Sequence, residues 1–192
     1  MIFGRKGKTE SSPPVYRPRV IESERLRLVA ADRTLVEADL AQNDALGALL
    51  GAAVPENWPP ELYDREAMRY ALNHLEDAGE RGWSFWYLLV IADGRDELVG
   101  ICGFKGRPDP LGSVEIGYSM LRQYRNQGYA SEAVDRLIRW AFNHHHVVEV
   151  SAETFPHLKP SIRVMQKNGF IHTGPGSERG VVRYAVSRPD RR

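Results

Sequence analysis

Cysteine is nearly absent from this chain, because the 192 residues include only Cys102. A single thiol excludes an intramolecular disulfide, and the sequence opens without a charged and then apolar secretory leader, so we expect a reducing, cytoplasmic location. No uninterrupted apolar run reaches the ~18 residues that span a bilayer, which predicts no membrane partner. The net charge of +1 lacks the basic excess of most nucleic-acid-binding domains, so no nucleic acid partner is expected.

Length and composition indicate one globular domain. The hydrophobic fraction is 42% and the charged fraction 27%, as in soluble folded proteins rather than disordered ones. A chain of 192 residues suffices for one ordinary domain that buries about two-thirds of its unfolded surface. We predict a flexible N-terminal tail over residues 1–19, a single domain over residues 20–188 and a C-terminal tail over residues 189–192.

Hydrophobic periodicity predicts a chain of mixed strands and helices. The expected strands cover residues 26–30, 83–92, 97–104, 113–120, 147–155, 170–173 and 181–187. A helical region is expected from 34 to 50 with Gly47 as its break, and three more helices begin near Asp64, Gly128 and Pro160. Strand, helix and strand over residues 113–155 require a parallel right-handed crossover. The fold class is therefore α/β (α+β), a mixed, mostly antiparallel central sheet of about seven strands flanked by about four helices.

The stretch from Glu115 to Glu132 carries the main functional signal. An apolar strand runs through a short turn into an amphipathic helix that begins near Gly128. The first turn of such a helix has free backbone amides and partial positive charge, which suit an anion and phosphate above all. Gly128 has no Cβ and lets a ligand approach the backbone, while Arg122 and Arg125 add formal charge beside it.

The residues Arg125-x-x-Gly128-x-Ala130 match the Arg/Gln-x-x-Gly-x-Gly/Ala signature of the GNAT superfamily of N-acetyltransferases, which the chain therefore resembles. For the motif alone, the alternative is a turn glycine beside a solvated arginine. The resemblance implies acetyl-coenzyme A as cofactor, and a strand around residues 118–120 that splays from its parallel neighbour to offer backbone groups to the pantetheine arm. The residues expected to bind the cofactor are Tyr118, Met120, Arg125, Asn126, Gln127, Gly128, Tyr129, Ala130 and Ser131.

A second block reinforces this resemblance near the end of the chain. Ser161-Ile-Arg-Val-Met-Gln-Lys-Asn-Gly-Phe170 is similar to the Ser-x-Arg-Val-x-x-Lys-x-Gly-Phe block of the branch that includes the RimJ and RimL ribosomal-protein acetyltransferases. The order of elements over about residues 20–188 also agrees with the GNAT fold. One departure is Leu158, where many members of that branch carry an asparagine that would contact the pantetheine arm.

Glu115 and Ser161 are the candidate catalytic residues. Glu115 alternates with Gly117 and Ser119 on one face of its strand, where an acceptor amine would arrive, so it is the candidate general base, directly or through water. The alternative is a glutamate paired with an arginine at a sheet edge. By resemblance, Ser161 would hydrogen-bond the coenzyme sulfur, and the alternative is an ordinary helix-start serine.

Other groups have supporting or alternative roles in this chemistry. Tyr129 and Tyr184 are substitutes for the acid role, because a phenol can donate to a thiolate. A free amide at Met120 would polarise the thioester oxygen. Trp58 and Tyr63 are candidates for an acceptor cleft, although aromatic residues mostly pack in cores.

We expect no metal site and no dinucleotide site. Three consecutive histidines, His144 to His146, cannot all face one ion. Cys102 lies in an apolar strand without evident activation. The pair Gly174-x-Gly176 lacks the full dinucleotide spacing and leads into a strand.

The sequence therefore predicts an acetyl-coenzyme A-dependent N-acetyltransferase that acts by direct attack of a primary amine in a ternary complex. The acceptor is a protein N-terminal amine or a small-molecule amine, and the protein is a monomer or homodimer. A non-catalytic acyl-coenzyme A binding or sensing module is the alternative, and a redox enzyme using a dinucleotide is a third class. Fold resemblance does not settle the acceptor.

Overall fold

The structure, a computed structural model, describes residues 16–42 and 44–189. In that part of the chain nine strands form one sheet in the order β1-β2-β4-β5-β6-β7-β9-β8, with β3 beside β5. The strands are β1 (Val20–Glu22), β2 (Leu26–Ala30), β3 (Ala52–Ala53), β4 (Phe85–Val90), β5 (Asp96–Phe104), β6 (Ser113–Met120), β7 (Glu149–Thr154), β8 (Ile171–Pro175) and β9 (Val182–Ser187). The α-helices are α1 (Arg33–Ala41), α2 (Ala45–Leu50), α3 (Arg65–His74), α4 (Tyr129–Phe142) and α5 (Lys159–Lys167). All strand pairs are antiparallel except β3 with β5 and β6 with β7.

The predicted fold class is confirmed, and two details of the prediction are wrong. The predicted helical region 34–50 is two helices, because Gln42 adopts a left-handed φ of 51° and ends α1 before Gly47 is reached. The capping residue of α1 is Asp32, whose side chain accepts from the amide of Leu35 at 3.0 Å. Strands β1 and β3 were not predicted, because two or three residues are too short to show a period.

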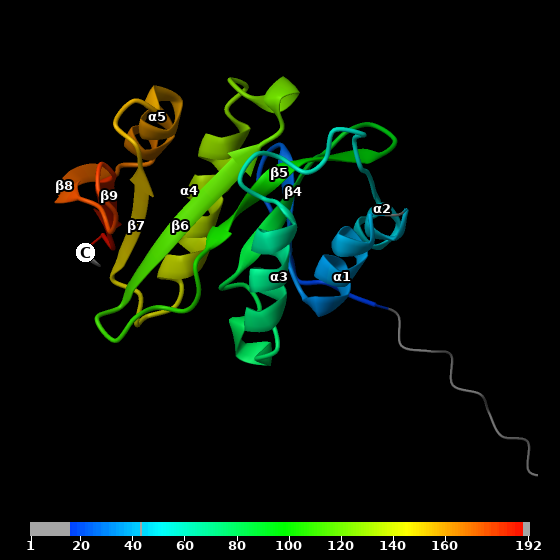
Figure 1. The fold of residues 1–192 in the computed structure, drawn as a ribbon, viewed down its shortest axis with the longest axis horizontal. Helices are drawn as coiled ribbons and strands as arrows, with labels where there is room; N and C mark the ends of the chain where they lie inside the picture. Colours follow the sequence, from blue (N-terminus) through cyan, green and yellow to red (C-terminus); the bar gives the residue numbers. More distant parts are fainter. Residues whose placement is uncertain (1–15, 43, 190–192) are drawn as a thin grey trace, which may run out of the picture.

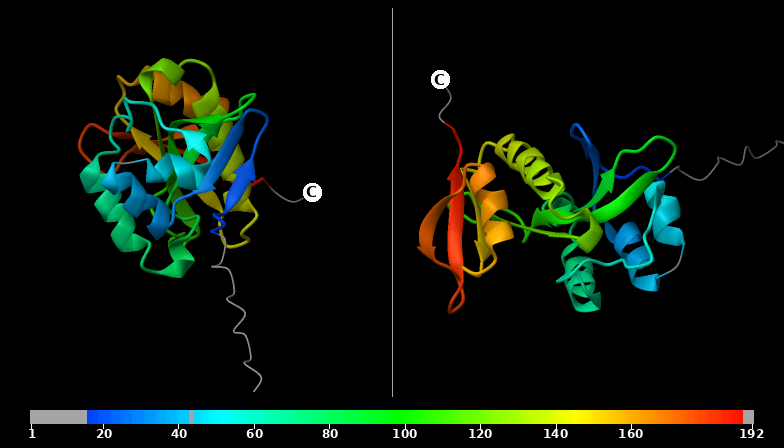
Figure 2. Two further views of the ribbon diagram at one scale, coloured as in Figure 1. Left: turned by 90° about the vertical axis from the view of Figure 1, so that its right-hand side faces the viewer. Right: turned by 90° about the horizontal axis from the view of Figure 1, so that it is seen from above.

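The sheet is covered on both faces by helices (Figure 1). Helix α4 lies on one face, and α1, α2 and α3 lie on the other, as seen from above in Figure 2. Trp86, Val134 and Leu137 belong to the core on the α4 face, while Leu35 and Tyr87 belong to the core on the opposite face. Both cores are buried, so the position of β6 between them is fixed by packing from two sides.

Strands β6 and β7 pair over a short distance and then diverge (Figure 1). Their parallel register joins residues 113–115 to residues 149–151 and ends there. Strand β6 continues along β5 to Met120, and β7 continues along β9 to Thr154. The two strands therefore open a wedge, as the resemblance implied for residues 118–120.

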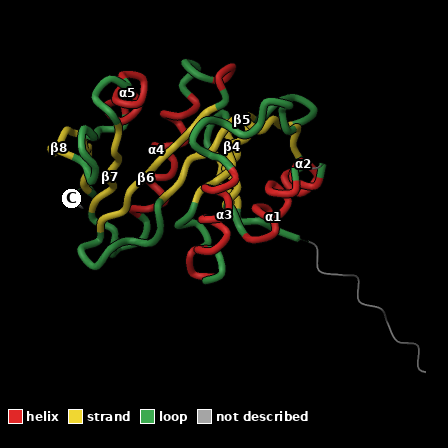
Figure 3. The backbone as a smooth tube through the Cα atoms, viewed as in Figure 1, coloured by secondary structure: helices red, strands yellow, loops and turns green. Residues whose placement is uncertain are grey.

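A long loop over residues 54–64 joins β3 to α3 and crosses the sheet toward the end of β6 (Figure 3). Its prolines have no backbone N–H to donate, so the loop does not form the hydrogen bonds of a helix or a sheet, as predicted. Asp64 ends the loop by accepting from the amides of Glu66 and Ala67, each at 3.0 Å, and so caps α3. The hydroxyl of Ser119 donates to the carbonyl of Glu61 at 2.5 Å, which fixes the loop against β6.

Most of the predicted N-terminal tail, and the last three residues of the chain, lie outside the described residues. Residues 16–19, which the prediction placed in that tail, contact the domain. The hydroxyl of Tyr16 donates to Asp32 at 2.7 Å, and the amide of Ala30 donates to the carbonyl of Arg19 at 2.9 Å. Among the described helices, none is long and apolar enough to cross a membrane.

Candidate active site

A cavity of about 910 Å³ opens where β6 and β7 diverge. Its lining residues extend from the start of α4 along β6 to β7 and α5. Of the residues predicted for the site, those lining it are Tyr118, Met120, Arg125, Asn126, Gly128, Tyr129, Ala130, Ser131 and Ser161. Gln127, Glu115, Trp58 and Tyr63 do not line it.

The turn before α4 has the geometry of an anion site. Gly128 is the N-cap of α4 at a φ of 87°, which side chains with a Cβ rarely adopt. No side chain caps this end, so the amides of the first turn of α4 have no partner within the helix. A Cβ added at Gly128 would lie 3.2 Å from Nη2 of Arg25, which shows how closely the space is bounded. These features fit the pyrophosphate of a coenzyme A molecule.

The arginines beside this turn are paired with a carboxylate that no sequence motif predicts. Arg125 Nη2 lies 3.0 Å from Glu61 Oε2, and Arg122 Nη2 lies 2.5 Å from Glu61 Oε1. Hydrogen bonds from Arg122 and then Arg125 lower the pKa of the Glu61 carboxyl. The Nε of Arg125 also donates to the carbonyl of Met120 at 3.0 Å, which aims the guanidinium at the cavity. Glu61 therefore lies where an anionic ligand would meet these arginines.

The turn is supported from outside the cavity by Arg25 and Glu132. The carboxylate of Glu132 accepts from Ser23 Oγ, from Arg25 N and from Arg25 Nε, each at 2.7 Å. Arg25 then donates to the carbonyl of Gln127 at 3.0 Å, and its guanidinium lies 4.7 Å from the ring centroid of Tyr129. Gln127 thus contributes its backbone to the shape of the turn rather than a side chain to the cavity.

Tyr118 and Ser161 meet across the wedge. The hydroxyl of Tyr118 donates to the carbonyl of Ser161 at 2.9 Å and lies 3.0 Å from its Oγ. Burial raises the pKa of Tyr118 to about 12, which keeps the phenol protonated at neutral pH. Tyr129 also lines the cavity, whereas Tyr184 does not and packs against His172 with ring centroids 5.3 Å apart.

Glu115 lies on the open face of β6 and forms an ion pair with Lys105. The partner of Glu115 is therefore a lysine rather than the arginine of the alternative prediction. Lys105 lines the cavity and Glu115 does not.

Trp58 and Tyr63 support the loop 54–64 through one buried carboxylate. Trp58 Nε1 donates to Asp39 Oδ1 at 2.8 Å, and the hydroxyl groups of Tyr63 and Tyr87 donate to Asp39 Oδ2 at 2.9 and 3.0 Å. The side chain of Tyr63 is 2% exposed, which places it in the core rather than at an acceptor cleft. Burial raises the pKa of Asp39, and the three hydrogen bonds partly offset this rise.

The cavity also brings together residues that sequence reasoning missed. They are Glu61, Leu62, Phe85, Lys105, Glu153, Arg163 and Lys167 among others. Arg163 and Lys167 lie four residues apart on α5 within the block that suggested the family, so helical spacing was the signal for them. The others come from separate strands and loops, and only the folded chain places them together.

Cys102 and His144 both pack within the folded domain. Cys102 is fully buried, and burial raises the pKa of its thiol. His144 lies with its Nδ1 3.0 Å from the carbonyl of Trp140, and its ring packs on Trp83. Within the described ranges, no three His, Cys, Asp or Glu side chains are grouped so as to hold a metal ion.

An uncapped helix end beside an open strand edge suits a ligand that carries a phosphate group and an extended arm. The chain belongs to the GNAT family, since the family model described as "Acetyltransferase (GNAT) domain" matches residues 25–171. Its cofactor is acetyl-coenzyme A, and the cavity that runs from Gly128 into the wedge fits that molecule.

Known relatives agree with this family. The uncharacterized N-acetyltransferase YjdG of Bacillus subtilis (strain 168) is 31% identical over 153 residues, which cover 79% of this chain and 89% of the relative. The uncharacterized N-acetyltransferase p20 of Bacillus licheniformis is 34% identical over 111 residues, covering 58% and 62% of the two chains. A solved structure of RimL, a ribosomal L7/L12 alpha-N-protein acetyltransferase in complex with coenzyme A, has a TM-score of 0.61 at 22% identity and covers 88% of this chain and 98% of that one. At 22% identity, this similarity to RimL shows a shared fold and nothing further.

Proposed function

We propose that the protein transfers an acetyl group from acetyl-coenzyme A to the nitrogen of a primary amine. The observation that carries this proposal is the course of the cavity, which connects the anion site at Gly128 with the open face of β6 through the wedge. A donor bound along the wedge and an acceptor arriving from that face would meet at β6. When bound, acetyl-coenzyme A supplies the acetyl group as a thioester, and the amine takes it by direct attack in a ternary complex.

Strand β6 offers the backbone groups that such a complex needs. The amide of Leu121 bonds to Val99 of β5, and the carbonyl of Glu115 accepts from Lys105. Backbone groups of odd-numbered residues in β6 therefore face β5, and those of Tyr118 and Met120 face the wedge. The carbonyl of Met120 is taken by Arg125, which leaves the amide of Met120 to polarise an acyl oxygen.

Ser161, positioned by Tyr118, would hydrogen-bond the sulfur of the departing coenzyme A thiolate. Tyr118 stays protonated and holds Ser161 through its carbonyl and its hydroxyl. The bond from Tyr118 to the Ser161 carbonyl would keep the serine in place, while the hydroxyl of Ser161 would turn its own proton from Tyr118 to the thiolate. Tyr129 lines the same cavity and is the second candidate for the donor.

Glu115 would accept the proton of the amine through a water beside Lys105. Its carboxylate lies on the acceptor face, and the ion pair with Lys105 holds it there. The anion site would hold the pyrophosphate with the amides of Tyr129, Ala130 and Ser131 and the guanidinium of Arg125. Asn126 and Gln127 shape the turn, the former at a φ of 61°.

The test is turnover of acetyl-coenzyme A with a panel of amines, followed by the release of free thiol. The panel includes small primary amines and peptides with free N-termini. RimL is a ribosomal L7/L12 alpha-N-protein acetyltransferase, and its likeness to this chain concerns the fold alone. We expect thiol release that depends on the amine. Coenzyme binding without turnover for any amine would instead support a sensing module, and a thermal shift with NAD(P) but not with coenzyme A would overturn the proposal.

A further inference from the structure

Glu153 lies at the acceptor side of the wedge. The last residues paired between β6 and β7 are Glu115 and Ser151. Glu153 lies two residues beyond Ser151 on β7, and Gly117 lies two residues beyond Glu115 on β6. If the pairing of β6 and β7 continued, Glu153 and Gly117 would be the next pair on this face. Because the strands diverge, both residues line the cavity. A Cβ added at Gly117 would meet nothing within 4 Å, so the space opposite Glu153 is open.

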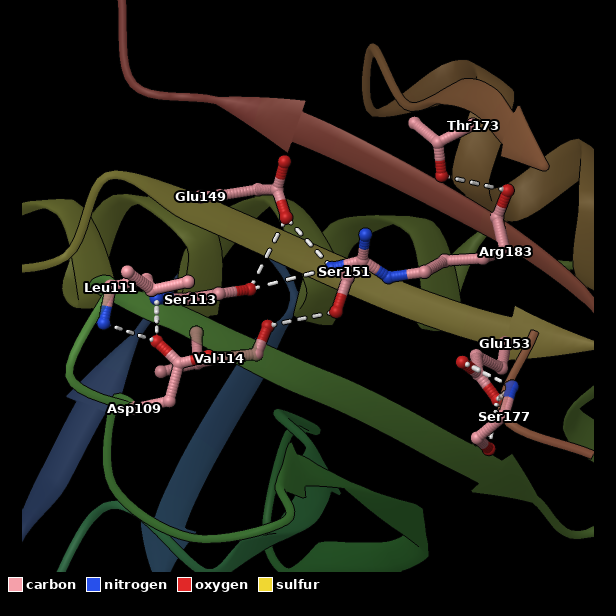
Figure 4. Close-up of polar contacts among 10 residues, drawn as sticks. All are labelled: Asp109, Leu111, Ser113, Val114, Glu149, Ser151, Glu153, Thr173, Ser177 and Arg183. Carbon is pink, nitrogen blue, oxygen red and sulfur yellow. Dashed lines mark hydrogen bonds and ion pairs between the residues drawn. The ribbon is translucent and has the colours of Figure 1, made fainter. Parts of the chain in front are cut away.

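The carboxylate of Glu153 is held in place by the loop that follows β8. The amide of Ser177 donates to both carboxylate oxygens at 3.0 Å, and its hydroxyl donates to Oε2 at 2.6 Å (Figure 4). Gly176 lies so close that an added Cβ would be 2.9 Å from Oε2. This anchoring limits the freedom of the side chain, so a ligand would find the charge already positioned.

In the described part of the chain, Glu153 forms no ion pair, unlike Glu115 and Glu149 on the same face. Lys105 pairs with Glu115, and Arg183 pairs with Glu149 at 2.8 Å, as Figure 4 shows for the second pair. Among the described residues, no cationic group lies within ion-pair distance of Glu153. Burial raises the pKa of Glu153, but the hydrogen bonds from Ser177 and the charges of Lys105 and Arg183 outweigh it and lower the pKa overall. The group is therefore a fixed anion at neutral pH.

We infer that Glu153 binds a second, non-reacting cation of the acceptor, so that the acceptor is a small amine carrying another protonated amine. This inference rests on the proposed function. An ion pair between Glu153 and the reacting nitrogen would stabilise the protonated form of that nitrogen, which cannot attack. Productive binding therefore places a different positive group of the same molecule on Glu153, and leaves the reacting amine free to approach β6 at Gly117.

The experiment compares n-pentylamine with 1,5-diaminopentane as acceptors for the wild type and for Glu153→Gln. Glutamine keeps an oxygen that can accept from Ser177, and it removes the charge. The kcat/KM for the diamine is first divided by two, because the diamine has two identical amines. For the wild type we then expect it to exceed the kcat/KM for the monoamine about tenfold, as expected for a charge-assisted contact. In Glu153→Gln that preference should fall to within about twofold, mainly through KM for the diamine.

Glu178→Gln is the matched control, because it removes an exposed carboxylate of the neighbouring loop that has no cation partner in the described structure. It should keep the diamine preference. Thiol release with n-pentylamine but no diamine preference in the wild type would overturn this inference alone, as would equal loss of both activities in Glu153→Gln. Absence of thiol release with both amines and with the whole acceptor panel would overturn the proposed function, and this inference with it.

Discussion

The hydroxyl of Tyr118 on β6 lies 3.0 Å from Oγ of Ser161 on α5, across the wedge where the strands diverge. These residues are 43 positions apart in the chain. The contact joins the side chain of Tyr118, at the edge of β6, to the first turn of α5, which follows β7 in the chain. It therefore links the two sides of the wedge. It also gives Tyr118 a side-chain role beyond the backbone contacts expected of it.

Replacing Ser161 with alanine should lower kcat by roughly 100-fold, because the departing thiolate loses its donor. Tyr118→Phe should lower kcat less, since it removes the group that positions Ser161 and leaves the serine in place. Burial raises the pKa of Tyr118 to about 12, so the ratio of wild-type to Tyr118→Phe activity should stay constant from pH 6 to pH 10. An alkaline limb that the wild type shows in this range and Tyr118→Phe lacks would identify Tyr118 as the titrating acid instead.

Replacing Gly128 with alanine should weaken coenzyme A binding at least tenfold, measured by calorimetry. The new Cβ would strain a backbone at a φ of 87° and fill space in front of the free amides. Gly180→Ala is the control, because its φ of 85° gives similar strain while its Cβ would meet nothing within 4 Å. Gly180→Ala should lose about 1 kcal/mol of stability and no coenzyme affinity. Equal affinities in the two variants would show that the phosphate turn is elsewhere.

The structure of the turn before α4 could be predicted because its signal is local. Gly128, the amphipathic face of α4 and the alternation of β6 all lie within a few tens of residues, and the structure confirms each. The pairing of Glu61 with Arg125 could not be predicted, because 64 residues separate them and a loop without periodicity carries Glu61. The burial of Tyr63 depends on Asp39, whose contact with it spans 24 residues. Long-range polar contacts of this kind leave no periodic trace in a sequence.

Replacing Glu61 with glutamine should tighten coenzyme A binding several-fold at low ionic strength. The carboxylate occupies Arg122 and Arg125, and an incoming phosphate must displace it. These arginines hold the pKa of Glu61 below its usual range, so it competes as an anion throughout the neutral range. Glu56→Gln, on the same loop and exposed, should leave the affinity unchanged. Weaker binding in Glu61→Gln would mean that Glu61 positions the arginines for the phosphate rather than competing with it.

Cys102 should not react with a thiol reagent in the native protein. Its side chain is fully buried on β5, and burial raises the pKa of the thiol, so the reactive thiolate is scarce. Denaturation should expose one thiol per chain, since the sequence contains a single cysteine. Titration with a chromogenic disulfide, with and without denaturant, checks both values. Rapid reaction of the native protein would show that β5 opens readily, and would require a correction in every assay of released coenzyme thiol.

Asp39 should make the stability of the protein depend on pH in a direction opposite to that of most carboxylates. Its pKa is raised above the usual 3.8 by burial, despite three hydrogen bonds from Trp58, Tyr63 and Tyr87. Below pH 3.8 both the folded and the unfolded chain hold this proton, and its stabilising contribution is complete. As the pH rises through the folded-state pKa, the unfolded chain releases the proton more readily, so the contribution is lost.

The comparison is with Asp39→Asn, which has nearly the same shape and no titrating proton. The melting temperature of the wild type, relative to that of Asp39→Asn, should fall as the pH rises from about 4 toward neutrality. Since about 1 kcal/mol corresponds to 2–4 °C for a chain of this size, calorimetry resolves the change. Asp44→Asn, an exposed aspartate before α2, controls for the general effect of removing one negative charge. A relative melting temperature that rises with pH would mean that the three donors outweigh burial, and that the carboxylate stabilises the loop 54–64 in its ionised form.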